Sequence, residues 1–135
     1  MKKALVLALS IVTAGIGFAG SASAQTALKD VQYIRDGIIH VGMAYQIGES
    51  CDSLRARTLR GLGFLNSLRA HASELGYSDD EIDAYVNDKA ERRRLEGIAR
   101  GELARLGAND ADDASYCAVG RAQMAANTRV GWLLR

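Results

Sequence analysis

Proline is absent from all 135 residues, and the 14 glycines fall both between and inside segments whose apolar side chains have helical spacing. Because proline is the residue that interrupts a helix most strongly, its absence favours helices along the whole chain. The sequence also lacks internal repeats and low-complexity tracts. We therefore expect one all-α domain rather than a repeat array or several modules.

Residues that commonly carry catalysis are scarce, with only two histidines and two cysteines in the chain. The sequence contains no Cys-x-x-Cys pair, no haem-attachment motif, no glycine-rich phosphate loop, no Ser/His/Asp set and no carboxylate pair suited to hydrolysis. We therefore predict no catalytic residues, no cofactor and a protein that is not an enzyme.

An excess of charge of one sign is lacking too. The 17 basic and 16 acidic residues are interleaved along the chain. A nucleic-acid-binding domain usually gathers basic residues on one face, so we expect no nucleic-acid partner.

The first 24 residues have the pattern of a secretory signal peptide. Lys2 and Lys3 precede an apolar run over residues 4–19, and an Ala-x-Ala site ends at Ala24. The run is shorter than the roughly 20 residues that span a bilayer, and we expect no transmembrane segment in the mature chain. The predicted domains are a signal peptide, 1–24, and a single helical domain, 25–135, located in the periplasm or secreted.

Four helices are predicted from apolar spacing and capping residues. The first begins near Asp30 and stops at Gly48, and the second is capped by Asp52 or Ser53 and stops at Gly76. The third begins at Ser78 and has a bend or break between Ala90 and Leu95, because its apolar face rotates there. The fourth is capped by Asp113 or Ser115 and runs to the C-terminus.

The strongest local signal is the sequence GYSDDEI. Gly76 has the place of a glycine just after a helix, while Ser78 and Glu81 have the spacing of a capping box. Tyr77 and Ile82 are placed to form the hydrophobic staple that often accompanies it.

Cys51 and Cys117 fall in loops that an antiparallel four-helix bundle brings to the same end. We expect a disulfide between them, since exported thiols enter an oxidising compartment. A reactive thiol at the start of a helix and a metal-bound cysteine are the alternatives. The bridge would close a loop of roughly 67 residues, worth about 4 kcal/mol in the chain-entropy model.

Eight glycines lie inside predicted helices, where each costs about 1 kcal/mol relative to alanine. They allow close helix crossings, or leave an apolar groove that Phe64, Met43, Met124 and Trp132 would line. The eight are Gly37, Gly42, Gly61, Gly63, Gly97, Gly101, Gly120 and Gly131. Arg121, Arg129 and Arg135 near Trp132 are a second candidate, a small anchoring surface at the C-terminus.

Two weak metal patterns are present. Asp36 with His40, and His71 with Glu74, share helix faces. The acidic loop with Asp110, Asp112 and Asp113 looks like a calcium loop but lacks the glycine and glutamate that one requires. We predict no metal and interpret the loop as an acidic cap of the last helix.

Three segments, LKDVQYIRDGIIHVG, LGYSDDEIDAYVNDKAE and SYCAVGRAQM, resemble an uncharacterised family of small exported alphaproteobacterial proteins, a domain of unknown function with two cysteines. The resemblance covers roughly residues 28–135. It implies an exported helical domain and no assigned activity.

The sequence favours a non-enzymatic module that binds an unknown protein partner through a helix face or a groove. One alternative is a carrier or sensor of a small apolar ligand held between the helices. Another, suggested only by architecture, is a chaperone similar to the acid-stress chaperones of the periplasm. An enzyme using Asp36, His40 or His71 is the least favoured.

Overall fold

A computed structural model describes residues 25–135, so the predicted signal peptide lies outside the described residues. This part of the chain is all-helical and has no strand. It consists of η1 (Leu28–Asp30), α1 (Gln32–Ser50), α2 (Thr58–Glu74), α3 (Asp79–Asn87), α4 (Lys89–Arg105), α5 (Asp113–Ala125) and α6 (Arg129–Trp132).

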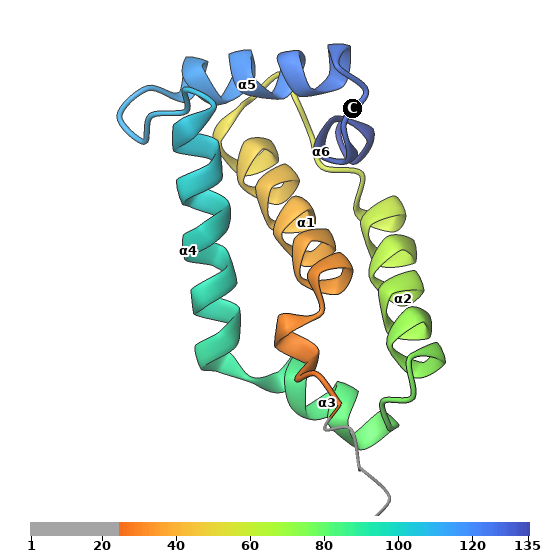
Figure 1. Ribbon diagram of the computed structural model, residues 1–135. Helices are drawn as coiled ribbons and strands as arrows, with labels where there is room; N and C mark the ends of the chain where they lie inside the picture. Colours follow the sequence, from red (N-terminus) through yellow and green to blue (C-terminus); the bar gives the residue numbers. More distant parts are fainter. Residues whose placement is uncertain (1–24) are drawn as a thin grey trace, which may run out of the picture.

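The three long helices run side by side (Figure 1). Helices α1 and α4 point in the same direction and α2 points in the opposite one, with the short α3 joining α2 to α4 at one end. At the other end, α5 lies across the ends of the long helices, and α6 folds back toward the start of α2. The predicted bundle of four antiparallel helices is not confirmed, because the last part of the chain crosses the bundle instead of running down it.

The main core surrounds the end of α1 that α5 covers. Its most deeply buried side chains include Ile47 from α1, Leu103 from α4, and Leu133 and Leu134 from the C-terminal end of the chain. A smaller cluster at the opposite end contains Leu28, Ile34, Ala72, Tyr77 and Ile82. Residues from both ends of the described range, 25–135, thus contribute to the apolar interior.

The start of the second helix was predicted too early. Residues 52–57 are not helical, and α2 begins at Thr58. Backbone groups of Arg55 exchange hydrogen bonds with Arg135 at 2.8 and 2.9 Å, and the Arg57 amide donates to the Leu133 carbonyl at 2.7 Å. Backbone groups of residues 55 and 57 are thus hydrogen-bonded to the C-terminal segment, and they are not available for an earlier turn of α2.

The predicted break in the third helix exists but lies earlier than expected, at Asp88. The Asp88 carboxylate accepts hydrogen bonds from the amides of Ala90 and Glu91 at 2.8 and 3.0 Å and thereby caps α4. The apolar face therefore rotates because two separate helices meet at this residue.

The predicted fourth helix is two helices, α5 and α6. Asn127 adopts a positive φ of 53°, a conformation that asparagine tolerates better than most residues. The Thr128 hydroxyl then accepts a hydrogen bond from the Gly131 amide at 3.0 Å and caps α6. This turn brings Trp132 back toward α2 instead of extending α5.

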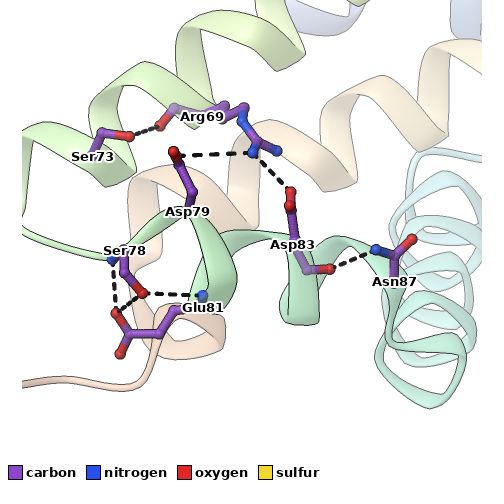
Figure 2. A network of polar contacts seen from close by, with 7 residues as sticks. All are labelled: Arg69, Ser73, Ser78, Asp79, Glu81, Asp83 and Asn87. Carbon is purple, nitrogen blue, oxygen red and sulfur yellow. Dashed lines mark hydrogen bonds and ion pairs between the residues drawn. The ribbon is translucent and has the colours of Figure 1, made fainter.

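The corner between α2 and α3 confirms the predicted capping box (Figure 2). The Ser78 hydroxyl accepts from the Glu81 amide at 3.2 Å, and the Ser78 amide donates to the Glu81 carboxylate at 2.8 Å. Gly76 has a φ of 93°, as expected of a glycine that ends a helix. Arg69 joins the two helices through an ion pair of 2.7 Å with Asp83.

Replacing the cap residue, Ser78→Ala, is expected to lower the free energy of unfolding by about 1 kcal/mol. Hydrogen bonds from the Ser78 amide and, second, from the Ser78 hydroxyl hold the pKa of the exposed Glu81 carboxyl below its ordinary value, and Ser78→Ala removes only the second of these bonds. The folded pKa is the lower one, so this stabilisation is present above the unfolded pKa and is lost as pH falls through the folded pKa. Urea denaturation of both proteins at neutral and acidic pH should show the difference shrinking with acid.

Ser73→Ala is the matched control, because the Ser73 hydroxyl only donates to the Arg69 carbonyl within α2. An equal loss of stability in the two variants would contradict the role given to Ser78.

Candidate functional site

One groove, called here the Trp132 groove, lies where α6 meets α1 and α2. It has a volume of about 500 Å³ and is lined by Tyr33, Arg60, Gly63, Phe64, Ser67, Arg129 and Trp132. Trp132 is 41% exposed and Phe64 is buried, so the tryptophan forms the accessible part of the aromatic surface. A large, partly exposed aromatic side chain beside a groove is typical of a binding site.

Two arginines stack on the aromatic rings of the Trp132 groove. The guanidinium carbon of Arg129 lies 4.7 Å from the ring centroid of Phe64 and 5.0 Å from that of Trp132. Arg60 lies 4.7 Å from the Trp132 ring and donates to the Trp132 carbonyl at 2.9 Å. The rings fix the planes of the guanidinium groups but do not neutralise their charge.

The Trp132 groove is therefore positively charged. Its lining contains two arginines and no acidic residue. Within residues 25–135, neither Arg60 nor Arg129 forms an ion pair with a carboxylate. The groove offers guanidinium donors to an anionic group, next to an aromatic surface that suits an apolar one.

A second hollow, called here the His40 cleft, lies between α1, α4 and the turn from α5 to α6. Its volume is about 510 Å³. It is lined by Arg35, Asp36, Ile39, His40, Met43, Arg94, Ile98, Glu102, Gln123, Thr128, Arg129 and Val130. Arg129 lines both hollows and so lies between them.

Burial lowers the pKa of His40 below its ordinary value, and the positive charge of Arg129 acts in the same direction. The carboxylates of Asp36 and Glu102 oppose this shift. Near neutral pH the imidazole is therefore uncharged, with one nitrogen able to donate a hydrogen bond and the other able to accept one.

Cys51 and Cys117 form a disulfide, with their Cα atoms 5.1 Å apart. The predicted bridge is confirmed, and the reactive thiol and the metal-bound cysteine are excluded. Ser53 lies beside the bridge, with its hydroxyl 3.3 Å from the sulfur of Cys51, and Arg121 donates to that hydroxyl at 3.4 Å. The bridge ties the end of α1 to the first turns of α5.

A family model described as a family of unknown function, DUF5333, matches residues 26–135. The chain belongs to this family. No curated protein and no solved structure matches the chain. The family covers both hollows and both cysteines, and it assigns no activity to any of them.

The four residues predicted to line a groove are not together. Phe64 and Trp132 meet in the Trp132 groove, with ring centroids 6.2 Å apart in an edge arrangement. Met43 is buried and borders the His40 cleft. Met124 packs against the main core and lines neither hollow.

Asp110, Asp112 and His71, from the two weak metal patterns, have other contacts. Asp112 caps α5, and Asp110 accepts a hydrogen bond from Tyr116, which raises the pKa of that phenol. The Nδ1 atom of His71 lies 3.7 Å from a carboxylate oxygen of Glu74, and His71 lines neither hollow. Over residues 25–135, no three His, Cys, Asp or Glu side chains are grouped so as to hold a metal ion.

Of Arg121, Arg129 and Arg135, which the sequence predicts near Trp132, only Arg129 stacks on its ring. Arg121 lies at the disulfide, and the backbone of Arg135 pairs with that of Arg55. Tyr33 and Arg60 line the groove without having been predicted to do so. Arg60 precedes Phe64 by four residues, so the two side chains share a face of α2, and this spacing could have predicted Arg60 as a groove residue.

No helix within residues 25–135 is long and apolar enough to cross a membrane.

Proposed function

We propose that the domain is exported and that it acts by binding a partner protein, without catalysing a reaction. The partner presents an acidic segment that carries an aromatic or aliphatic side chain, and this segment binds in the Trp132 groove. One observation carries the proposal: two arginines that lack carboxylate partners are stacked on a partly exposed tryptophan.

Arg60 and Arg129 support binding because their guanidinium groups are already oriented by the rings beneath them. An oriented side chain loses less conformational freedom when a ligand binds, so more of the interaction energy contributes to affinity. Tryptophan and arginine are also the residues that most often dominate the energy of a protein interface. An acidic side chain would pair with a guanidinium group, while its apolar neighbour would cover the indole ring.

Export is supported by the N-terminal sequence, in which Lys2 and Lys3 precede an apolar run and an Ala-x-Ala site. The disulfide agrees with an oxidising compartment. Intact-mass measurement of the protein from its native cells tests this part of the proposal. We expect a chain that begins at Gln25.

The binding proposal can be tested with the fluorescence of Trp132, because it is the one tryptophan in the sequence. The probe is a peptide of alternating glutamate and leucine, and the comparison peptide has lysine at each glutamate position. We expect a saturable change in Trp132 emission with the acidic peptide and none with the basic one. Affinity should fall as salt concentration rises, because salt screens exposed charges.

Arg60→Glu is expected to weaken binding of the acidic peptide by about tenfold or more, since it replaces an attraction by a repulsion. Arg93→Glu is the matched control, because Arg93 is an exposed arginine of α4 that lines neither hollow. Equal effects of the two substitutions would mean that only the net charge of the domain matters, and this would contradict a specific groove.

The native partner can be sought with a photo-crosslinking residue at position 63. Gly63 lines the Trp132 groove, and a Cβ atom added there meets nothing within 4 Å. Gly97 on α4 is equally open and provides the control position. We expect one protein to be crosslinked from position 63 but not from 97, and to be lost when Arg60→Glu is combined with the crosslinker.

A further inference from the structure

The His40 cleft combines an apolar floor with a polar rim. The floor comes from three helices, through Ile39 and Met43 of α1, Ile98 of α4 and Val130 of α6. Its volume of about 510 Å³ is within the range of roughly 300–1,000 Å³ found for small-molecule sites. Four of the twelve lining residues are apolar and eight are polar, so the cleft is more polar than a typical small-molecule site.

Ion pairs already use most of the charges on the rim. Asp36 pairs with Arg35 at 3.0 Å, and Glu102 pairs with Arg105, which does not line the cleft. Arg94 forms two hydrogen bonds with the Glu91 carboxylate, at 2.6 and 2.7 Å. Both carboxylates of the cleft are thus paired.

Arg129 and His40 are the remaining ionisable groups of the cleft. Within residues 25–135, Arg129 has no carboxylate partner and stacks only on aromatic rings, and His40 makes no hydrogen bond through its side chain. One permanent positive charge and one imidazole are therefore available to a ligand. Their chemistry suits an anion rather than a cation.

We propose that the His40 cleft binds a small amphiphilic anion, whose carboxylate or phosphate group contacts Arg129 and His40 and whose short apolar part lies on the floor of the cleft. This site is separate from the Trp132 groove, and the proposal does not rest on the binding of a partner protein. Arg129 is the one residue that lines both.

The two histidines of the chain provide an internal comparison. His40 lines the cleft, and His71 lies on α2 beside Tyr33 and Glu74. The side-chain resonances of both can be followed by NMR during titration with hexanoate, hexyl phosphate, hexylammonium and inorganic phosphate. We expect hexanoate or hexyl phosphate to shift His40 saturably and to leave His71 unchanged.

Bound anions should also raise the pKa of His40, because they favour the imidazolium form. The charged groups around the imidazole are Asp36 of the same helix, Glu102 of α4 and Arg129 of α6, with Arg35 and Arg94 elsewhere on the rim. The variant His40→Gln keeps a donor but removes this titration. The rise in pKa is therefore a property of the bound state that a merely structural role of His40 would not produce.

The four probes separate the contributions to binding. Tighter binding of hexanoate indicates a carboxylate ligand, and tighter binding of hexyl phosphate indicates a phosphate ligand. Inorganic phosphate should bind at least tenfold more weakly than hexyl phosphate, because it leaves the apolar floor empty. If hexylammonium shifts His40 as strongly as hexanoate does, or if no probe shifts it, the proposal is overturned.

Substitutions separate this site from the Trp132 groove. Arg129→Gln is expected to weaken anion binding about tenfold or more, and its exposed side chain makes the change compatible with folding. Arg60→Gln should leave anion binding within about twofold of the parent, since Arg60 lines the Trp132 groove and not the cleft. Unchanged affinity in Arg129→Gln would overturn the assignment of that residue, and equal losses in both variants would overturn the separation of the two sites.

Discussion

Reduction of the disulfide between Cys51 and Cys117 is expected to lower the free energy of unfolding by about 4 kcal/mol. The bridge joins residues 66 positions apart, so the unfolded chain gains a large amount of conformational freedom once it is broken. For a domain of this size the change corresponds to a fall in melting temperature on the order of 15 °C. Thermal unfolding of one preparation, with and without a reductant, measures it directly.

The control is a double variant, Cys51→Ala with Cys117→Ala. It should melt at one temperature whether or not the reductant is present, and below the reduced parent. Cys51 is only 1% exposed, so removing its sulfur also leaves a small cavity. A reduced parent that melts together with the oxidised one would show that helix packing alone fixes the end of α1 against α5.

Local signals in the sequence predicted the parts of the fold that depend on neighbouring residues. The capping box at Ser78 needs only four consecutive residues, and the structure contains it as predicted. The pairing of Cys51 with Cys117 required a topology as well, and it was predicted correctly although the four-helix arrangement is not confirmed. The predicted bundle and the observed fold both bring the end of α1 close to the start of the helix that carries Cys117.

The missed boundaries divide into two kinds. The break at Asp88 and the turn at Asn127 and Thr128 have local signals, because aspartate and threonine are good N-caps and asparagine tolerates a positive φ. The late start of α2 has no local signal. It depends on hydrogen bonds between Arg57 and Leu133, which are far apart in the sequence.

These boundaries also explain which parts of the Trp132 groove could be predicted. Phe64 and Trp132 were candidates because large apolar side chains beside glycines can line a groove. Their contact with each other depends on the turn at Asn127, which folds α6 back toward α2. The position of Arg129 over both rings follows from the same turn, so a single continuous helix would have separated these residues.

The glycines inside the helices have two different environments. A Cβ added at Gly120 would lie 2.5 Å from a methyl group of Leu54, and one added at Gly131 would overlap the backbone carbonyl of Gln123. Additions at Gly61, Gly63, Gly97 and Gly101 would meet nothing within 4 Å. Close crossings therefore account for Gly120 and Gly131, while the four open glycines serve no packing purpose.

Gly131→Ala is expected to destabilise the domain by about 3 kcal/mol, at the upper end of the usual cost of overpacking. The added methyl group meets backbone atoms of Gln123 and Met124, which cannot rotate away as a side chain can. Gly120→Ala should cost less, because the methyl groups of Leu54 and Ile47 can move to other rotamers. Urea denaturation of the two variants and the parent measures their free energies of unfolding and shows which substitution costs more.

Gly97→Ala completes the series and should stabilise the domain by about 0.5–1 kcal/mol, since alanine favours the helical backbone and the position is open. Relief of the overlap in Gly131→Ala requires α6 to move away from α5, and Trp132 and Arg129 would move with it. Gly131→Ala should therefore weaken peptide binding in the Trp132 groove, whereas Gly97→Ala should not. A Gly131→Ala protein as stable as the parent would mean that the turn between α5 and α6 can open without cost, and that α6 does not hold these two side chains in place.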